Sequence, residues 1–571
     1  MIYIVSQDGS GDFTGVQQAV DAVPAGSTRP TVILIRAGEY RERVIVNKDR
    51  LRLIGEDRDR TVIAYNACAK DRDEAGNERG TFLSFTLLVT GRDVEVENLT
   101  VKNDAGDGRE VGQAVAVYAA GDRGVWRGCR FLACQDTLFC GPVMPKVKKL
   151  AAPRELGCEC VDSVGDCPVT ASRQYFENCF IRGDVDFIFG PYRCWFEKCT
   201  LHMNARGGFY TAANTPEKQE AGMVFSHCVL TGDCGPGEAF LGRPWRAFAR
   251  TVFLKCEMRE QVAPEGFRDW DEKRVITRRC AEYASFGPGA APEKRNSREH
   301  LLTPEEASLY SVSSILGGAD LWRPDRRVPT WFLCGDSLMA DYPDSRFPMT
   351  GWGQTLQSLM PFPAYVENCA VNGRSSKSFV AEARLGLIEL CLRPGDRLVI
   401  GFGHNDEKPD RERSTDPHTT FPDYLDLFID AARRRGAEPV LVTPVVRRAF
   451  DENGVLLGTH GAYPNAVRAL TERRGARLVD LERLTARLVS ALGPEGSKSF
   501  FCHVPAGTEN YPDGLSDNSH LKQGGAAAVA RLFLDALSDT APEKDGALPP
   551  AGPAPSSLLQ KEDRVLGNDF Y

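Results

Sequence analysis

The feature of the sequence that most constrains the fold is a short pattern that recurs between residues 31 and 258. Each copy is a run of β-branched and aromatic residues, and the copies lie at 94–100, 125–131, 175–181, 194–200, 224–230 and 252–258. In five of them a cysteine takes the same place: Cys129, Cys179, Cys199, Cys228 and Cys256. Imperfect repeats of a strand and a turn predict a parallel β-helix, whose coils stack on one another. The five cysteines then form an interior ladder of small apolar residues, which explains them as packing rather than chemistry.

An antiparallel sandwich is the alternative fold for this region. It requires tight turns between adjacent strands, for which Asn-Gly and Asp-Gly pairs are the usual signals. Few such pairs occur between the strand-like runs, so the sequence favours the β-helix.

The pattern changes near residue 330 to an alternation of strands and helices. Apolar runs at 330–333, 397–401, 439–443 and 477–481 alternate with helical stretches such as 421–435 and 465–474. This alternation predicts α/β units around a parallel sheet. We therefore expect two domains, at 1–325 and 328–538. Residues 539–571 are rich in Pro, Ala, Gly and charge and are expected to form a disordered tail.

The composition excludes some classes of function. The 571-residue chain carries a net charge of −8, so nothing suggests a nucleic-acid partner, and an anionic substrate would have to be captured by local arginines. No run of about 20 apolar residues predicts a membrane span. The N-terminus lacks the basic and apolar regions of a secretory signal, so we expect a cytoplasmic protein, with a secreted one as the alternative. The oligomeric state does not follow from the sequence.

The 18 cysteines raise the question of disulfides or a metal site. A large chain without a secretory signal favours free, mostly buried thiols. Cys158, Cys160 and Cys167 lie close together, but a Cys-x-Cys pair is tighter than the usual zinc spacing, and no second pair or nearby histidine follows. We therefore expect no metal site.

Two aspartates are candidate catalytic groups in the first half. Asp136 lies in Cys-Gln-Asp-Thr-Leu, and Asp186 lies in Gly-Asp-Val-Asp-Phe-Ile-Phe-Gly. Burial raises the pKa of a carboxyl group and a nearby arginine lowers it, so two carboxyls in different environments can act as an acid and a nucleophile. The other candidates are Arg243, to hold the ionised aspartate, Trp245, to stack on a sugar ring, and Gln113 and Gln135, as donors to a developing oxyanion.

These residues belong to motifs that, in their order, resemble the pectin methylesterase family. The resemblance covers about residues 2–325 and rests on motifs at 8–13, 38–42, 112–116, 135–137, 186–190, 241–245 and 283–290. It implies a right-handed parallel β-helix without a metal or cofactor. It also implies that Asp186 attacks the methyl ester of a galacturonate, and that Asp136 protonates the departing methanol and then activates water. The remaining implied roles are oxyanion stabilisation by Gln113 and Gln135, orientation of Asp186 by Arg243 and sugar contact by Trp245.

One segment departs from the family pattern. A long insertion at about 141–172 holds the clustered cysteines and the basic residues Lys146, Lys148 and Lys149. We expect a surface loop. The alternative is that it lies over the cleft and restricts access to short chains.

In the second half, Ser337 follows an apolar strand, so it can point into a cleft at the carboxyl edge of the sheet. His520 lies near the end of the domain, three residues after Asp517. Asp517 can orient His520, which can then deprotonate Ser337. Gly373 offers a backbone N–H and Asn405 a side-chain amide to an oxyanion. The Gly-x-Ser-x-Gly motif of α/β-hydrolases is absent, which argues against that fold.

These four blocks, in this order, resemble the SGNH (GDSL-type) hydrolase family over about residues 328–538. The resemblance implies an α/β/α fold with a flavodoxin-like parallel sheet. It makes Ser337 the nucleophile, His520 the base and Asp517 its partner, with an oxyanion hole of Ser337 N–H, Gly373 and Asn405. The third block, Gly-His-Asn-Asp, is most similar to that of rhamnogalacturonan acetylesterases. His404 and His503 are expected to be structural or to line the substrate.

Both halves therefore predict ester hydrolysis on one class of substrate. We expect a bifunctional carbohydrate esterase that removes methyl esters from galacturonate and acetyl esters from pectic sugars, on oligosaccharides or polysaccharide. One alternative is a serine esterase of other specificity, a lipase or thioesterase, that carries a carbohydrate-binding β-helix. Another is a β-helix that cleaves glycosidic bonds, which would need a different set of carboxylates.

Overall fold

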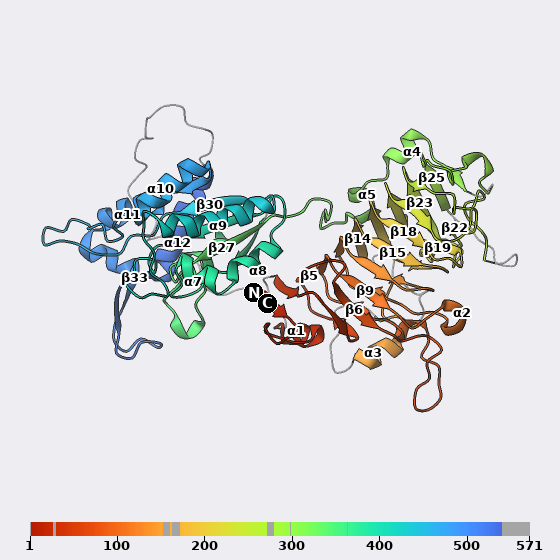
Figure 1. Cartoon of the computed structure of the whole chain (residues 1–571), viewed down its shortest axis with the longest axis horizontal. Helices are drawn as coiled ribbons and strands as arrows, with labels where there is room; N and C mark the ends of the chain where they lie inside the picture. Colours follow the sequence, from red (N-terminus) through yellow and green to blue (C-terminus); the bar gives the residue numbers. More distant parts are fainter. Residues whose placement is uncertain are drawn as a thin grey trace. The chain divides into compact units, whose positions relative to one another are not determined.

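The computed structural model describes residues 2–24, 26, 30–151, 160–162, 172–270, 279–296, 299–361 and 364–538 (Figure 1). The chain forms two compact units, and each is described by itself. The first comprises Met1–Pro329 with Gly386–Arg393, and the second comprises Thr330–Leu385 and Pro394 onward. The expected tail at 539–571 lies outside the described residues. In the described part of the chain, no helix is long and apolar enough to cross a membrane.

The first unit is built from three parallel sheets, here called sheets A, B and C. Sheet A contains β1 (Ile2–Val5), β2 (Thr31–Ile35), β5 (Leu51–Gly55), β8 (Glu95–Glu97), β11 (Gly124–Arg127), β14 (Arg173–Glu177), β17 (Arg193–Glu197), β20 (Met223–Ser226), β23 (Arg250–Leu254), β25 (Arg279–Tyr283) and β26 (His300–Leu301). Sheet B contains β3 (Gly38–Arg41), β6 (Thr61–Tyr65), β9 (Thr100–Asn103), β12 (Arg130–Leu132), β15 (Phe180–Gly183), β18 (Thr200–Met203), β21 (Val229–Gly232) and β24 (Glu257–Met258). Sheet C contains β4 (Val44–Val46), β7 (Leu87–Val89), β10 (Val117–Ala119), β13 (Leu138–Cys140), β16 (Ile188–Gly190), β19 (Gly208–Ala213) and β22 (Ala239–Gly242).

The chain visits the three sheets in turn, so each strand pairs in parallel with its counterparts one coil before and one coil after. In sheet A, for example, Phe176 of β14 lies opposite Phe196 of β17, which lies opposite Phe225 of β20. This is the topology of a parallel β-helix, so the fold predicted for the first half is confirmed. Short helices lie at its ends and on its loops: α1 (Val16–Ala22), α2 (Gly108–Val111), α3 (Pro145–Ala151), α4 (Pro304–Ser308) and α5 (Val312–Leu316).

The five repeated cysteines line the interior of this coil, as the pattern predicted. All are at most 1% exposed. Each follows a residue with a left-handed φ of 51–58°, at the sharp turn from sheet A to sheet B. Each thiol also donates to a backbone carbonyl of the preceding coil, as Cys179 does to Trp126 at 3.4 Å and Cys228 does to Phe196 at 3.4 Å. None of the described cysteines forms a disulfide bond. The ladder therefore serves packing, and each buried thiol finds a hydrogen-bond acceptor in the coil before it.

A second interior ladder is aromatic. One ring per coil stacks on the next with centroids 4.5–5.9 Å apart and planes within 14° of parallel: Trp126, Phe176, Phe196, Phe225 and Phe253. Offset stacking adds to the free energy gained by burying these rings. The ladder thus ties coils together across the whole central part of the unit.

Truncating the middle ring of this ladder tests its contribution. Phe196→Ala is expected to lower the free energy of unfolding of the first unit by about 3–5 kcal/mol, because it removes a fully buried ring and leaves a cavity. Denaturant unfolding measures this change. The matched control is Phe286→Ala, whose side chain is 57% exposed and whose loss is expected to stay within about 0.5 kcal/mol. Equal losses in the two variants would contradict the role of the ladder.

The second unit is a three-layer α/β/α domain, as predicted. Its parallel sheet has the order β28 (Tyr365–Asn368), β27 (Thr330–Gly335), β29 (Arg397–Gly401), β30 (Glu438–Val442) and β31 (Arg477–Val479). The helices are α6 (Trp352–Leu359), α7 (Ser376–Ala381), α9 (Thr420–Arg434), α10 (Tyr463–Arg474), α11 (Leu481–Gly496) and α12 (Gln523–Ser538). A further helix, α8 (Arg384–Cys391), begins in this unit, and its residues from Gly386 onward belong to the first unit. An antiparallel pair, β32 (Phe501–Val504) and β33 (Leu515–Leu521), follows α11.

Helices pack on both faces of this sheet, so the apolar core has two parts. Trp331 and Leu333 of β27 pack with α6, α11 and α12 in one apolar cluster. On the other face, α9 packs on β29 and β30 and also contacts α7 and α10. Since all five strands are parallel, their carboxyl ends meet at one edge, where Ser337 follows β27 and residues 402–406 follow β29.

Candidate active sites

The two candidate aspartates of the first unit lie on equivalent turns of neighbouring coils. Asp136 lies between β12 and β13, and Asp186 lies between β15 and β16. The Asp136 N–H donates to the Val185 carbonyl at 3.1 Å, which joins the two turns. Both aspartates have a left-handed φ, 67° for Asp136 and 54° for Asp186. Such conformations cost about 1–3 kcal/mol each and concentrate at functional sites, because the surrounding fold must enforce them.

Arg243 holds Asp186 in a bidentate ion pair. Its Nε lies 2.8 Å from Asp186 Oδ1 and its Nη2 lies 2.6 Å from Oδ2. Two aromatic rings clamp the guanidinium: its carbon lies 3.8 Å from the centroid of Trp270 and 4.5 Å from that of Phe209. The sequence did not reveal either ring, since neither belongs to a recognisable motif. The clamp fixes the arginine, which in turn fixes the carboxylate.

The environments of the two carboxyls differ in the way that an acid and a nucleophile require. Burial raises the pKa of Asp136 well above its usual value, and the nearby charge of Asp186 adds to the effect. Burial also raises the pKa of Asp186, but there the two hydrogen bonds and the charge of Arg243 oppose it. Asp136 is therefore the carboxyl better suited to carry a proton, and Asp186 is the one whose ionised form Arg243 stabilises.

The remaining candidates of this unit surround the pair. The backbones of Gln113 and Gln135 are paired in a parallel bridge, so the two glutamines are neighbours, and Gln135 directly precedes Asp136. Trp245 lies with its ring centroid 6.0 Å from that of Phe189, which is in the strand that follows Asp186. The structure thus brings these residues to one region of the surface, and their roles in oxyanion and sugar binding stay predictions.

The base of the insertion at 141–172 packs close to this region. Val147 of α3 is fully buried in an apolar cluster with Phe139 and Phe189 of sheet C. Residues 152–159 and 163–171, including Cys158 and Cys167, lie outside the described residues. Within the described part of the chain, no group of three or more His, Cys, Asp or Glu side chains could hold a metal ion.

The burial of the Asp136 carboxyl group has a measurable consequence for stability. The raised pKa means that the folded protein binds this proton more tightly than the unfolded chain does. The resulting stabilisation is full below the unfolded pKa of about 3.9 and is lost as the pH rises through the raised folded value. Asp136→Asn removes this loss, and asparagine tolerates a positive φ. We expect the variant to melt higher than wild type at pH 8, by about 2–4 °C for each kcal/mol recovered, with a smaller difference at pH 4.5. An equal shift at both pH values would contradict the buried-charge explanation.

In the second unit, the structure assembles the predicted catalytic triad. His520 Nε2 lies 3.0 Å from Ser337 Oγ, and His520 Nδ1 lies 2.7 Å from Asp517 Oδ2. Asp517 Oδ1 also accepts the backbone N–H groups of Ser519 and His520, at 2.7 and 2.9 Å. Burial works against ionisation, but these hydrogen bonds lower the pKa of Asp517 to about 2. Asp517 is therefore a carboxylate at neutral pH, suited to hold and charge-stabilise the histidine.

The oxyanion candidates come together beside one another. Gly373 has a left-handed φ of 78°, and open space lies where a side chain would begin. Asn405 Nδ2 donates to the Arg374 carbonyl at 3.1 Å, and its Oδ1 accepts from Arg413 Nη1 at 3.4 Å. These two contacts orient the amide and leave its second N–H available for an oxyanion.

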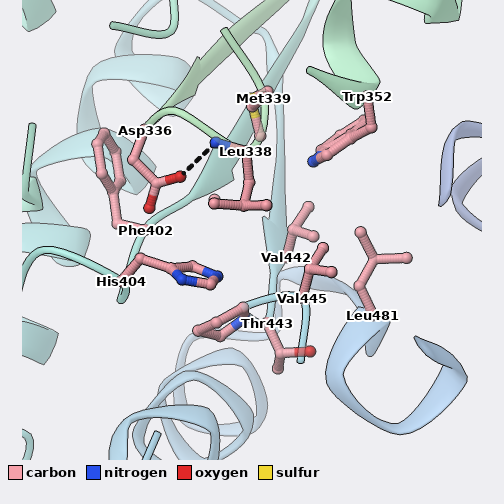
Figure 2. A pocket seen from close by; sticks show the side chains of 12 residues that line it. Asp336, Leu338, Met339, Trp352, Phe402, His404, Val442, Thr443, Val445 and Leu481 are labelled. Atoms are coloured by element: carbon pink, nitrogen blue, oxygen red, sulfur yellow. Dashed lines mark hydrogen bonds between the residues drawn. The ribbon is translucent and has the colours of Figure 1, made fainter. Parts of the chain in front are cut away.

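His404 and His503 lie outside the triad. His404 is buried, and Figure 2 shows it with Asp336 on one side of a cavity of about 20 Å³, across from Trp352 and Leu481. Burial lowers the pKa of His404 well below its usual value, so the imidazole is neutral. Whether it is structural or lines the substrate stays a prediction. His503 contacts Asn518 and Ser516 at 2.8 and 3.2 Å.

Three residues beside the candidate catalytic and oxyanion residues were not predicted from the sequence. Asp336 precedes the nucleophile and accepts the Leu338 N–H at 3.0 Å; burial raises its pKa to about 6. The Tyr342 hydroxyl donates to the Ser337 carbonyl at 3.0 Å, and its ring lies 6.5 Å from that of His520. Asp406 follows Asn405 directly and is fully buried. Asp336 and Asp406 could have been found from their positions next to Ser337 and Asn405 in the sequence. No sequence signal indicated Tyr342.

Comparison with known proteins agrees with this division of the chain. The pectinesterase family model matches residues 2–142 and 163–319, so the gap between the matched stretches falls inside the insertion. The model of the GDSL-like lipase/acylhydrolase family matches residues 333–528.

Similar proteins are found for each unit. Rhamnogalacturonan acetylesterase RhgT of Bacillus subtilis (strain 168) is 45% identical over 209 residues, which are 36% of this chain and 89% of that protein. Pectinesterase 31 of Arabidopsis thaliana is 35% identical over 320 residues, which are 55% of this chain and 91% of that protein. A crystal structure of a pectin methylesterase in complex with a hexasaccharide is 27% identical and covers 56% of this chain and 98% of that one, with a TM-score of 0.46.

Proposed function

Because the chain belongs to the pectinesterase family through its first unit and to the GDSL-like lipase/acylhydrolase family through its second, we propose that it is a bifunctional pectin esterase. The first unit hydrolyses methyl esters of galacturonate, and the second removes acetyl groups from pectic sugars. The enzyme is a carboxylic ester hydrolase in both parts, and its substrates are pectic oligosaccharides or polysaccharide.

In the first unit, the Asp186 carboxylate attacks the methyl ester carbonyl while Arg243 holds it in place. Protonated Asp136 donates its proton to the departing methanol and leaves an acyl-enzyme anhydride on Asp186. Asp136, now ionised, takes a proton from water, which attacks the anhydride and releases the free uronate. Gln113 and Gln135 donate hydrogen bonds to the oxyanion formed in each step.

In the second unit, His520 takes the proton of Ser337 Oγ as the serine attacks the acetyl carbonyl. His520 then passes this proton to the departing sugar hydroxyl, while Asp517 stabilises the imidazolium. Water, deprotonated by His520, releases acetate from the acetyl-serine. The Ser337 N–H, Gly373 N–H and Asn405 amide bind the oxyanion.

One observation carries the proposal: each unit that matches an esterase family also contains a complete set of reacting groups. The first has a bidentate Arg243–Asp186 pair beside the buried Asp136, and the second has a continuous Ser337–His520–Asp517 chain of hydrogen bonds. Both sets of groups are suited to transfer an acyl group to water, and neither reaction needs a co-substrate other than water.

Product analysis with the wild-type enzyme tests the proposal. Incubation with methylated, acetylated pectic oligosaccharides is expected to release both methanol and acetate without new reducing ends. New reducing ends would show that the β-helix cleaves glycosidic bonds. Acetate without methanol would reduce the first unit to a carbohydrate-binding module or an esterase for another ester.

A further inference from the structure

The buried carboxylate of Asp406 has no part in the chemistry described above. It accepts the backbone N–H of Ser376 at 3.1 and 3.2 Å through its two oxygens, and the Ser376 hydroxyl at 2.5 Å. The Thr415 hydroxyl adds a longer contact at 3.3 Å. Three donor groups therefore reach its side chain, and the residue itself is 0% exposed.

These contacts join the two segments that supply oxyanion donors. Ser376 is the first residue of α7 and lies three residues after Gly373. Asp406 directly follows Asn405. A second link runs in the other direction, from Asn405 Nδ2 to the Arg374 carbonyl at 3.1 Å. The segments 373–376 and 405–406 are thus joined to each other at two points, Ser376–Asp406 and Arg374–Asn405.

Retaining a carboxylate at this position has an energetic cost. Burial raises the pKa of Asp406 to about 7, although the bonds from Ser376 lower it. Buried ionisable groups are expensive even when they are hydrogen-bonded, and an apolar residue of similar volume is often equally stabilising. A carboxyl group that accepts hydrogen bonds from three donors can fix the geometry between the segments 373–376 and 405–406, which an apolar residue cannot do.

We propose that Asp406 is a positioning residue for the oxyanion hole of the second unit, setting the distance between the Gly373 N–H and the Asn405 amide. The proposal deepens the serine esterase function and rests on it. Oxyanion donors act over a narrow range of distances, and losing one costs about 10²–10³-fold in kcat. A displacement of about 1 Å can cost about 10²-fold in rate. Weakening the hydrogen bonds that Asp406 accepts from Ser376, here called the tether, is therefore expected to reduce kcat more than it raises KM.

The test uses Asp406→Asn in the full-length enzyme with p-nitrophenyl acetate as substrate. Asparagine keeps the size of the side chain and one oxygen, but it removes the charge and puts an NH₂ group in place of Oδ2, which accepts the Ser376 N–H at 3.2 Å. The hydrogen bonds between Asp406 and Ser376 therefore weaken. We expect kcat to fall about 10–100-fold, with KM within about threefold of wild type. The matched control is Asp396→Asn, a buried carboxylate that accepts the Thr330 N–H at 2.8 Å at the opposite, amino end of the sheet. Its kcat is expected to remain that of wild type.

A double-mutant cycle separates positioning from a general structural role. In an Asn405→Ala background, the further effect of Asp406→Asn on kcat is expected to shrink to less than about threefold, because the donor that it positions is gone. Ser376→Ala, which removes one bond of the tether, is expected to show a smaller fall that also shrinks in this background. It provides the test if Asp406→Asn does not fold.

Two results would overturn the proposal. One is an undiminished effect of either substitution in the Asn405→Ala background, and the other is wild-type kcat in the folded variants. Methanol release by the same preparations reports that the first unit is intact. The p-nitrophenyl ester needs only the triad and the oxyanion hole, so failure to release acetate from pectic sugars would refute the assigned substrate and leave this test unaffected.

Discussion

Asp186→Asn is expected to slow methanol release by about 10⁴-fold or more while leaving acetate release unchanged. The amide is a poor nucleophile, and it also loses the ion pair with Arg243, whose two contacts at 2.6 and 2.8 Å hold the carboxylate. Removing the nucleophile of an acyl-transfer enzyme typically costs about 10⁴–10⁶-fold in kcat. Methanol and acetate measured in one reaction with a methylated, acetylated pectic oligosaccharide provide the comparison.

Asp184→Asn is the matched control for this variant. Asp184 is also a buried aspartate of the same turn, but its carboxylate lies 3.9 Å from Arg206 and contacts the Val185 N–H rather than Arg243. We expect methanol release by this variant to stay within about tenfold of wild type. Methanol release by Asp186→Asn at more than a hundredth of the wild-type rate would exclude Asp186 as the nucleophile.

Ser337→Ala is expected to have the opposite selectivity. Without the hydroxyl that lies 3.0 Å from His520 Nε2, no acetyl-enzyme can form, and acetate release should fall by about 10⁴–10⁶-fold. Methanol release should not change, because the two reactions use separate sets of residues. Loss of both products from this single substitution would argue instead for one shared site or for a folding defect.

The control for Ser337→Ala is a serine of the same unit that only contacts its own helix. Ser358 of α6 donates to the Thr355 carbonyl at 2.8 Å, so Ser358→Ala is expected to keep the wild-type rate of acetate release. A covalent serine reagent offers a second readout. It should label wild type and Ser358→Ala, and fail to label Ser337→Ala.

Much of the fold was predictable because both architectures repeat a local rule. In the first unit, a cysteine at the same place in each copy of the pattern occupies the equivalent position in each coil. Cys129 and Cys256 could therefore be assigned to one interior ladder without knowledge of the loops between them. In the second unit, Ser337 and Asn405 each follow an apolar run, and parallel strands bring their carboxyl ends to one edge.

The contacts that could not be predicted join segments that share no sequence pattern. Trp270 and Phe209 reach Arg243 from different coils, and neither the spacing nor the composition around them indicates the clamp. The tether from Asp406 to Ser376 spans 30 residues. The local geometry of Asp517 and His520 was also not predicted: both lie in strand β33, and hydrogen bonds from the Ser519 and His520 N–H groups to Asp517 set their arrangement.

The cysteine ladder gives this protein a set of internal reporters. Each thiol sits in its own coil and is closed to solvent, so an alkylating reagent reaches it only when that coil opens. In a stack where coils contact only their neighbours, opening can spread from an end or start in the middle. The order in which Cys129, Cys179, Cys199, Cys228 and Cys256 become alkylated under mild denaturation, read by mass spectrometry, would therefore trace the route by which the solenoid unwinds.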